Sequence, residues 1–289
     1  MEQEKIASID LHMHTTVSDG TDTPEEIIGK VRDAGVGIFS VTDHDAVAGA
    51  AAIRKAQPED LFFITGAEFS AKDEGGKYHI LAYDYDPEAD AILAAVEKAH
   101  GLRMHKVKAR LEFLKERFGF TFSKEELKDL FALNNPGKPH IANLMIRHGY
   151  AADRKQAIRD FINQKKFPTQ VLTPQEVIGA ILESGGIPVL AHPIYGSGDD
   201  LILGDDLEER IRHLTQMGIA GVEAFYSGFT PKMIDQVLRL AEKYELLVTA
   251  GSDYHGTNKL ISIGETNYPG GRGTVPGLES FLTRVLEKD

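Results

Sequence analysis

Side chains that can bind metal ions recur along this chain in short clusters, most of them just after an apolar segment. They are His12, His14, Asp19, Asp43, His44, Glu68, His79, His192, Asp253 and His255. Histidine is the commonest neutral metal ligand, and carboxylates suit harder divalent ions. One such pair would mean little, but several His-x-His and Asp-His pairs brought together at strand ends could hold more than one divalent ion.

Not every histidine or carboxylate in the chain needs to be a ligand. A lone histidine is more often a hydrogen-bonded structural residue, which is how we interpret four on helical stretches: His100, His105, His148 and His213. His12 and His14 differ, because alternate residues on a strand point the same way and can share an ion. We interpret Asp43 as a carboxylate that orients a ligand histidine. Glu223 ends a predicted strand and either supports the site or forms a structural salt bridge.

Seven short apolar segments rich in β-branched residues predict the strands that must position these side chains. They span residues 6–11, 38–42, 61–65, 78–83, 187–191, 221–225 and 247–250. Helical patterns separate most of them, and two helix starts carry an N-cap threonine, a proline and a glutamate, at Thr23-Pro24-Glu25-Glu26 and Thr173-Pro174-Gln175-Glu176. About seven parallel strands predict an α/β fold, a distorted (β/α)7-type barrel that gathers catalytic residues at the C-terminal strand ends.

Residues 88–171 interrupt this alternation and are predicted to form a helical insertion between barrel segments 1–87 and 172–289. Residues 98–171 hold 16 Lys and Arg against 7 Asp and Glu, a net charge of +9 in a chain of net charge −12, so the rest carries −21. A basic cap over an acidic, metal-binding barrel suits an anionic substrate. A solvated helix face is the alternative explanation for such a run of charge.

Composition sets the outer limits. The 289 residues, 42% of them hydrophobic, are enough for one large barrel or a core with an insertion. The chain has no cysteine, which excludes disulfides, thiolate nucleophiles and sulfur-ligated zinc. The first residues lack a basic region followed by an apolar stretch, and no apolar run approaches the ~20 residues of a membrane span. We therefore expect a cytoplasmic protein without a membrane partner, and its oligomeric state stays open.

Seven motifs together resemble the polymerase and histidinol phosphatase (PHP) family of metal-dependent phosphoesterases. In chain order they are Asp10-Leu11-His12-Met13-His14-Thr15, Ser18-Asp19-Gly20, Thr42-Asp43-His44-Asp45, Gly66-Ala67-Glu68, His79-Ile80-Leu81, Ala191-His192-Pro193 and Gly251-Ser252-Asp253-Tyr254-His255. The insertion is similar to the branch of small bacterial PHP enzymes that act on nucleoside 3′,5′-bisphosphates and on 5′ ends of short oligonucleotides. Within it, Lys138-Pro139-His140-Ile141-Ala142 resembles the Arg-Pro-His-Ile-Ala stretch of that branch, with lysine in place of arginine.

The resemblance implies two to three divalent ions, Mn, Zn, Fe or Mg, in the mouth of a distorted barrel. It assigns the ligands in three sets, the first two of which share Glu68: His12, His14, Glu68 and Asp253; Glu68, His79 and His192; and Asp19, His44 and His255. Phosphate ester hydrolysis needs a hydroxide and neutralisation of phosphoryl charge, and ions ~3.5 to 4 Å apart supply both. His192 or His255 would assist proton transfer, with Glu68 as the bridging carboxylate.

Substrate contacts follow less directly from the sequence. Lys138 and His140 are candidates for binding a second phosphate, and Tyr226 and Ser227 follow a strand and could supply donors. No basic residue closely follows His192-Pro193, where many relatives carry one. The expected activity is hydrolysis of a nucleotide phosphomonoester, either a nucleoside 3′,5′-bisphosphate or an oligonucleotide 5′ end. The alternatives are histidinol phosphate phosphatase or another small-molecule phosphatase, a metal-dependent amidohydrolase, and a non-catalytic metal-binding module.

Overall fold

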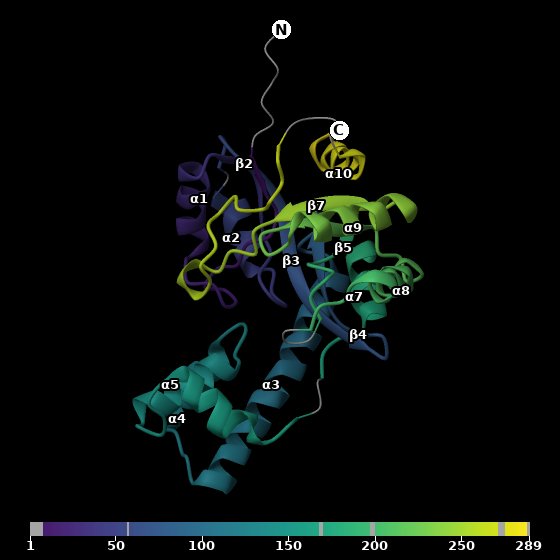
Figure 1. Ribbon diagram of the computed structural model, residues 1–289. Coiled ribbons are helices and arrows are strands. Elements are labelled where there is room, and N and C mark those ends of the chain that lie inside the picture. The colour runs from purple at the N-terminus through teal and green to yellow at the C-terminus, as the bar shows by residue number, and fades with distance from the viewer. Residues whose placement is uncertain (1–7, 57, 168–169, 197–199, 271–274, 288–289) are drawn as a thin grey trace. The chain divides into compact units, whose positions relative to one another are not determined.

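Seven strands form one sheet in which the order in space follows the order in the chain (Figure 1). The computed structural model describes residues 8–56, 58–167, 170–196, 200–270 and 275–287. The strands are β1 (Ser8–Asp10), β2 (Val36–Val41), β3 (Phe62–Asp73), β4 (Gly76–Tyr83), β5 (Ile187–Leu190), β6 (Gly221–Tyr226) and β7 (Leu247–Gly251). Residues 6 and 7 of the first predicted strand lie outside the described residues. All seven strand predictions overlap observed strands.

The prediction that all strands run parallel is wrong for β4. This strand pairs antiparallel with both β3 and β5, whereas the other neighbouring pairs are parallel. The reason is the tight connection between β3 and β4, because a turn this short allows only an antiparallel hairpin and a parallel crossover needs a dozen or more residues. β3 also continues well past the predicted end at residue 65, so Glu68 lies within it.

Backbone hydrogen bonds from the segment after β1 to β7 and to the loop after β7 join the two ends of the sheet. Leu11 N donates to Ala250 O over 2.9 Å, and His14 N donates to Tyr254 O over 2.8 Å. The expected distorted barrel is thus observed. The same bonds fix the two loops that carry most of the clustered histidines and carboxylates.

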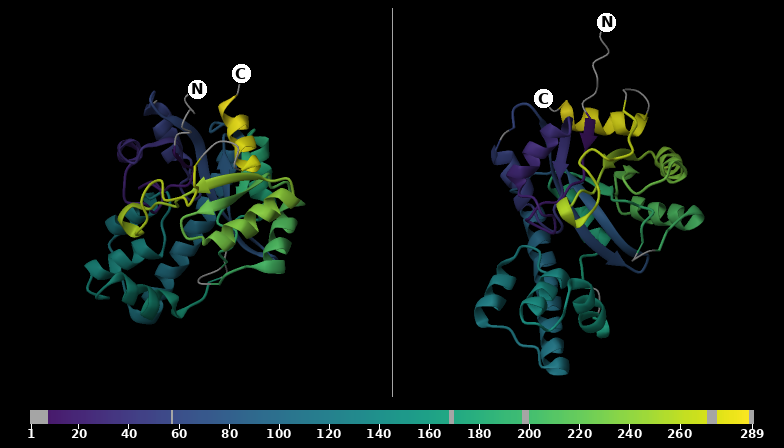
Figure 2. Two further views of the ribbon diagram at one scale, coloured as in Figure 1. Left: turned by 45° about the horizontal axis from the view of Figure 1, so that its top comes forward. Right: turned by 60° about the vertical axis from the view of Figure 1, so that its left-hand side comes forward.

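Helices pack against the outer face of this sheet, as Figure 2 shows. They are α1 (Pro24–Asp33), α2 (Ala48–Ala56), α7 (Pro174–Glu183), α8 (Gly204–Thr215), α9 (Pro231–Lys243) and α10 (Pro276–Leu286), and a short 3-10 turn, η3 (Gly256–Asn258), follows β7. Both predicted capping boxes form, at Thr23 and at Thr173. Gly35 and Gly185 follow α1 and α7 with φ of 68° and 73°, a left-handed conformation that ends a helix at little cost in glycine.

The chain divides into two units by its contacts. The barrel unit comprises Met1–Val96 and Leu172–Asp289, and the helical unit comprises Glu97–Val171. The helical unit contains most of α3 (Asp90–Phe118), then α4 (Lys124–Ala132), α5 (Lys138–Arg147), α6 (Arg154–Gln156) and the short turns η1 (Ala157–Phe161) and η2 (Ile162–Gln164). Its apolar side chains bury one another in a separate core that includes Val107, Leu114, Ile141 and Met145.

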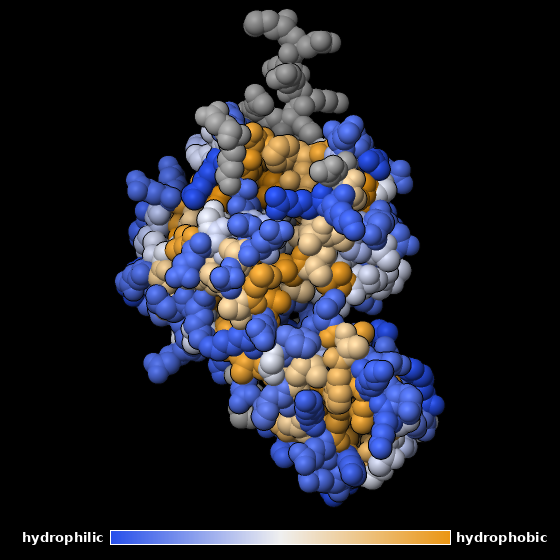
Figure 3. Space-filling view, turned by 180° about the vertical axis from the view of Figure 1, so that it is seen from behind, coloured by the Kyte–Doolittle hydropathy of each residue, from blue (hydrophilic) through white to orange (hydrophobic). Residues whose placement is uncertain are grey.

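Hydrophilic side chains cover most of the visible surface of both units, with hydrophobic ones gathered in smaller patches (Figure 3). Within the described ranges, no helix combines the length and apolar character needed to cross a membrane. The cytoplasmic location stays a prediction of the sequence.

Candidate metal centre

The segment after β1 presents two histidines to one side. Met13, between His12 and His14, forms a bridge to Tyr254 and is buried in an apolar cluster with Phe39. Because successive side chains of an extended chain point in opposite directions, this anchoring turns both imidazoles the other way, into the barrel mouth. The two histidines lie just beyond β1 rather than within it, but they keep the alternation that the sequence predicted.

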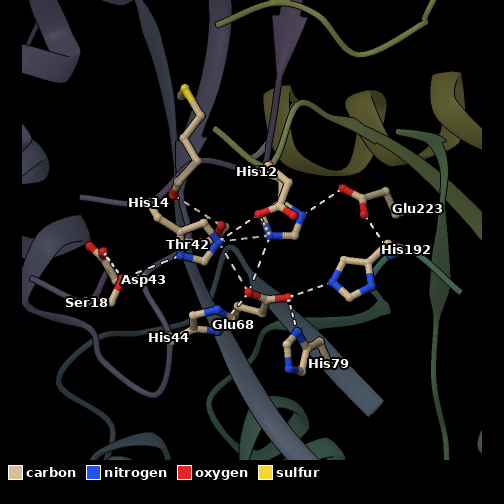
Figure 4. A network of polar contacts seen from close by, with 12 residues as sticks. His12, His14, Ser18, Thr42, Asp43, His44, Glu68, His79, His192 and Glu223 are labelled. Carbon is tan, nitrogen blue, oxygen red and sulfur yellow. Dashed lines mark hydrogen bonds and ion pairs between the residues drawn. The ribbon is translucent and has the colours of Figure 1, made fainter. Parts of the chain in front are cut away.

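Four donor atoms converge at this point. His12 Nε2 lies 3.2 Å from His14 Nε2, 3.4 Å from Glu68 Oε2 and 3.6 Å from Asp253 Oδ1. His14 Nε2 lies 3.3 Å from each of the same two carboxylate oxygens. Figure 4 shows the two rings and Glu68 facing one another. This is the arrangement of two imidazoles and two carboxylates around a common centre.

Glu68 occupies the middle of the cluster and connects its parts (Figure 4). Its Oε1 lies 2.9 Å from His79 Nδ1 and 3.2 Å from His192 Nε2, while its Oε2 lies 2.9 Å from His44 Nδ1. His79 comes from the first half of β4, near the start of the strand predicted at residues 78–83, unlike the side chains expected at C-terminal strand ends. Because β4 runs antiparallel, its early residues lie beside the middle of β3 and reach the same centre.

A third group of donors lies on the far side of His14. Asp19 Oδ1 lies 3.3 Å from His255 Nε2 and 3.8 Å from His14 Nδ1, and Asp19 Oδ2 lies 3.9 Å from His44 Nε2. One donor atom from each of these four residues falls within a 4.8 Å cluster. The structure therefore brings all nine residues of the predicted ligand set into one connected centre, with His14 and His44 each facing two groups.

Glu223 supports two of the histidines. Its Oε1 accepts a hydrogen bond from His12 Nδ1 at 2.9 Å, and its Oε2 accepts the backbone N–H of His192 at 2.8 Å. An irregular register in β6 adjoins Glu223, and Gly251 opposite leaves room for it, since a Cβ there would lie 2.4 Å from Glu223 Oε1. These contacts are those expected of a residue that orients predicted ligands, and a hydrogen bond on Nδ1 leaves His12 Nε2 available as a ligand.

Asp43 acts one step further out than expected. Its Oδ1 accepts bonds from Thr15 N at 2.8 Å and Ser18 Oγ at 2.6 Å, and its Oδ2 accepts a bond from Thr15 Oγ1 at 2.8 Å. Ser18 Oγ in turn lies 3.5 Å from His14 Nδ1. Asp43 thus holds the turn that follows His14 and reaches the histidine only through Ser18.

Two residues near the centre were given no role by the sequence. Buried Asp10 accepts bonds from Ser252 N at 3.0 Å and Gly264 N at 2.8 Å, and burial raises the pKa of its carboxyl to about 6. Lys259 donates to Asp253 Oδ2 over 2.5 Å. Asp10 is the first residue of one of the seven motifs, so the sequence did contain a signal for its role. Lys259, a single lysine four residues after His255, belongs to no motif and gave no such signal.

Electrostatics of the centre favour a proton on two of the histidines, His12 and His44. Burial opposes the charged imidazolium of His12, but Glu223 and Glu68 raise its pKa well above the usual value. Burial likewise opposes charge on His44, yet Glu68 and Asp19 raise its pKa to about 9. Both rings would therefore carry a proton at neutral pH where no other cation lies among the carboxylates.

The carboxylates respond in the opposite sense. Burial opposes ionisation of Glu68, but His44 and His79 hold its pKa well below the usual range. Burial also opposes ionisation of Asp253, and His12 is the first of the charges that lower its pKa. The centre thus combines ionised carboxylates with imidazoles that would give up protons to a divalent ion, which is the chemistry of a nitrogen and oxygen metal site.

Two further observations show that the residues suit metal ions. His192 Nδ1 is buried and, within the described part of the chain, forms no hydrogen bond, while Nε2 of the same ring faces Glu68. His192 and Asp253 adopt positive φ, 26° and 59°, in the loops after β5 and β7. A non-glycine residue is held in that conformation only where its surroundings require it, and here both side chains point into the centre.

The predicted substrate contacts are engaged within the protein. Tyr226 Oη donates to Asp253 Oδ2 over 2.7 Å, so this side chain does reach the centre. Ser227 Oγ donates to the carbonyl of Ser252 over 2.8 Å, which gives it a role in fixing the loop. In the helical unit, Lys138 Nζ donates to Asn163 Oδ1 over 2.6 Å.

His140 and three other histidines of the chain also have local partners. His140 Nδ1 accepts the Gly137 N–H over 3.2 Å, at the start of α5. The structural interpretation of three further histidines is confirmed by their bonds, which join His100 to Asn134 O, His148 to Glu126 and His213 to Asp73.

Comparison with known proteins identifies relatives across most of the chain. A family model for the PHP domain matches residues 10–167, more than half of the sequence. The chain is 30% identical over 259 residues to phosphoribosyl 1,2-cyclic phosphate 1,2-diphosphodiesterase of Eggerthella lenta, covering 86% of this chain and 94% of that protein. It is 27% identical over 263 residues to the 5′-3′ exoribonuclease of Haemophilus influenzae, covering 89% and 93%.

A third relative and a solved structure complete the comparison. The 3′,5′-nucleoside bisphosphate phosphatase of Chromobacterium violaceum is 26% identical over 267 residues, covering 86% of this chain and 88% of that protein. A crystal structure from Bifidobacterium adolescentis, assigned to the metal-dependent phosphoesterases, superimposes with a TM-score of 0.76 at 30% identity over 90% of this chain and 92% of that one. The similarity therefore includes both fold and sequence.

Proposed function

This chain belongs to the PHP family of metal-dependent phosphoesterases, and we propose that it hydrolyses a phosphomonoester of a nucleotide. The observation that carries the proposal is the convergence of nine residues with nitrogen and oxygen donors, with Glu68 at the middle of the cluster. Once it holds divalent ions, such a centre can bind a phosphoryl group and neutralise its charge. The preferred substrate is a nucleoside 3′,5′-bisphosphate or the 5′ end of a short oligonucleotide.

In this proposal the nine residues hold two to three divalent ions. His12, His14, Glu68 and Asp253 would hold one, Glu68, His79 and His192 a second, and Asp19, His44 and His255 a third. Bound ions would supply hydroxide at neutral pH and neutralise charge on the phosphoryl oxygens. His14 and His44 face two groups each, so these rings decide how the ions share ligands.

Of the two histidines expected to move a proton, His192 is better placed. Both ring nitrogens of His255 are engaged, because Nδ1 contacts Asp253 O at 2.9 Å and Nε2 lies 3.3 Å from Asp19. His192 directs Nε2 to Glu68, while its Nδ1, within the described residues, has no hydrogen-bond partner. His192 can therefore remain a ligand through one nitrogen and hold a proton at the other.

Two features support a nucleotide as substrate. Relatives from Haemophilus influenzae and Chromobacterium violaceum are named for a ribonuclease and a nucleoside bisphosphate phosphatase. The excess of Lys and Arg in residues 98–171 supports a substrate with more than one anionic group. We propose that the helical unit selects the substrate through these charges. A cyclic phosphodiester is a second candidate, because the Eggerthella lenta relative is 30% identical and is named for that reaction.

A substrate panel tests the proposal. The manganese-loaded protein should be assayed for phosphate release from adenosine 3′,5′-bisphosphate, AMP, a 5′-phosphorylated trinucleotide, histidinol phosphate and a ribose cyclic phosphate, with acylated amides as a separate class. We expect the bisphosphate or the trinucleotide to give the highest kcat/KM. Preference for histidinol phosphate, the cyclic ester or an amide would replace the proposal with that activity. Reaction in oxygen-18 water should label the released phosphate, and label found only in the alcohol would exclude attack at phosphorus.

A further inference from the structure

Lys259 lies at the edge of the metal centre. Its ammonium contacts Asp253 Oδ2 at 2.5 Å, and 39% of the side chain remains exposed. The other oxygen of the same carboxylate, Oδ1, faces His12 at 3.6 Å and His14 at 3.3 Å. Lys259 therefore joins a side chain of the centre to an exposed position.

The backbone that carries Lys259 is fixed to another part of the centre. Thr257 N donates to Thr21 Oγ1 over 2.9 Å, and Asn258 Nδ2 donates to Asp19 O over 2.8 Å. Both donors belong to η3, the turn immediately before the lysine. Because Asp19 is itself one of the converging carboxylates, Lys259 is held in register with the centre and not on a free loop.

Asp253 does not depend on Lys259 for its hydrogen bonds. Tyr226 Oη already donates to Asp253 Oδ2 over 2.7 Å, and the side chain of Asp253 is 7% exposed. A lysine ammonium has three N–H donors, and within the described residues Lys259 uses one of them, toward Asp253. Two N–H donors of the ammonium thus remain beside the centre.

We propose that Lys259 binds the phosphoryl group of the substrate at the metal centre. Ile194, Tyr195 and Gly196 follow His192-Pro193, so this loop beside the centre offers no cation at these three positions. Lys259 supplies a cation from the loop after β7. The inference rests on the proposed phosphoesterase function and adds to it a substrate-binding residue outside the nine converging side chains.

The charges in the centre explain why Lys259 could bind a phosphoryl group in addition to its contact with Asp253. When cations occupy the centre, they share the charge of Asp253, so its hold on the ammonium weakens. A phosphoryl group brings up to two negative charges and several acceptor oxygens, to which a compact ammonium donates strong charge-assisted bonds. A purely structural role would instead leave Lys259 as the counter-ion of Asp253, with its effect confined to metal affinity.

Binding of inorganic phosphate separates these two roles. Lys259→Met should weaken orthophosphate binding to the manganese-loaded protein by about tenfold or more in calorimetry, while manganese stoichiometry and affinity change by less than about threefold. Lys259→Arg should recover most of the phosphate affinity. The matched control is Lys243→Met, which removes another lysine that contacts a carboxylate, Glu208, away from the centre, and should leave both affinities unchanged.

Each other outcome overturns the inference. If Lys259→Met alters manganese affinity but not phosphate affinity, the lysine is a counter-ion of Asp253, and if it alters neither, it has no role in the centre. Thermal melting of each variant identifies loss of folding, in which case Lys259→Arg and Lys259→Gln replace the methionine variant. Failure of the wild-type protein to hydrolyse any phosphate ester would reject the proposed function without deciding the phosphate-binding result.

Discussion

The barrel unit and the helical unit differ in how their polar side chains are paired. In the barrel unit, ring nitrogens and carboxylate oxygens approach one another at 2.9 to 3.6 Å, and each buried oxygen of Glu68 faces more than one ring nitrogen. In the helical unit, Lys138 donates to Asn163 and His140 accepts the N–H of Gly137. The barrel unit concentrates polar groups that need a further partner, whereas these helical-unit side chains have found theirs locally.

This difference indicates which unit carries the chemistry and which unit supports it. Burying so many imidazoles and carboxylates together costs free energy unless they are paired or bind a cation, so the barrel unit's cluster has a functional explanation. The helical unit has its own apolar core and a basic composition, which suit it to a supporting or selecting role. Substitutions in the two units should therefore give different phenotypes.

The largest expected effect comes from Glu68→Ala. Since Glu68 contacts donors of all three proposed groups, its loss should lower kcat/KM by about a thousandfold or more and reduce bound metal by at least one equivalent. Elemental analysis and steady-state kinetics measure both. The matched variant in the helical unit is Glu126→Ala, which removes a helix-capping carboxylate and should lower stability but not metal content. Equal metal loss in both variants would abolish the contrast between the units.

Glu223→Ala should have a smaller effect, because this residue touches ligands and would not be one. Its removal frees His12 Nδ1 and the His192 backbone N–H, so metal affinity or activity should fall by about 10- to 100-fold. Glu223→Gln keeps a carbonyl acceptor and should retain more affinity than alanine. A metal titration of the three proteins distinguishes an orienting role from a structural one, which would lower the melting temperature without changing affinity.

Metal binding should release protons and strengthen with pH. In the metal-free protein the pKa of His44 is raised to about 9, above the ordinary 6.5, so a proton must leave before an ion can bind. Affinity should rise by up to about tenfold per pH unit for each proton displaced, between pH 6.5 and 9. Calorimetry in two buffers of different ionisation enthalpy measures the release, and an identical heat in both would contradict it.

The same shift affects folding with a defined sign. A histidine whose pKa is raised in the folded state stabilises the fold fully below pH 6.5 and loses that contribution as pH rises through 9. The metal-free protein should therefore show a falling melting temperature over this range, whereas the loaded protein, in which ions replace the protons, should not.

Lys138→Ala tests selection by the helical unit. It should raise KM for a doubly phosphorylated nucleotide by about tenfold at most, because the contact with Asn163 competes for the ammonium, and should leave KM for a mononucleotide nearly unchanged. Added salt should shrink the difference. If both substrates lose equally, the helical unit is a structural element and not a selector.

The smallest effect is expected for His140→Ala. This change removes the acceptor for Gly137 N–H at the start of α5 and should destabilise the helical unit by about 1 kcal/mol, as loss of a helix cap does. Denaturant unfolding measures it, with metal content as the control. Loss of phosphate binding without loss of stability would instead indicate that His140 binds the substrate.

Much of the centre could be predicted because its chemistry depends on residue type. Imidazole and carboxylate groups in His-x-His and Asp-His pairs after apolar segments leave few uses other than metal binding. Hydrogen-bond assignments could not be predicted, because they depend on loop geometry. The Ser227 hydroxyl binds a backbone carbonyl and Asp43 binds Thr15, while Lys259 reaches Asp253 only because η3 is fixed to Thr21.

The fold shows the same division. Apolar runs and capping residues predicted where strands and helices lie, as at Thr23 and Thr173. The direction of β4 could not be read from them, because a buried strand has the same composition whichever way it runs. The tight turn before Gly76 makes β4 antiparallel to β3, and this pairing places His79 beside Glu68.

The left-handed backbone at His192 and Asp253 affects which substitutions selection would favour at these two positions. A side chain in that region costs about 1–2 kcal/mol relative to glycine. Glycine at either position should therefore stabilise the fold while removing a predicted metal ligand. A library screened only for heat resistance would drift toward glycine there and yield robust, inactive proteins. The mouth of the barrel is thus a place where selection for durability and selection for turnover pull in opposite directions.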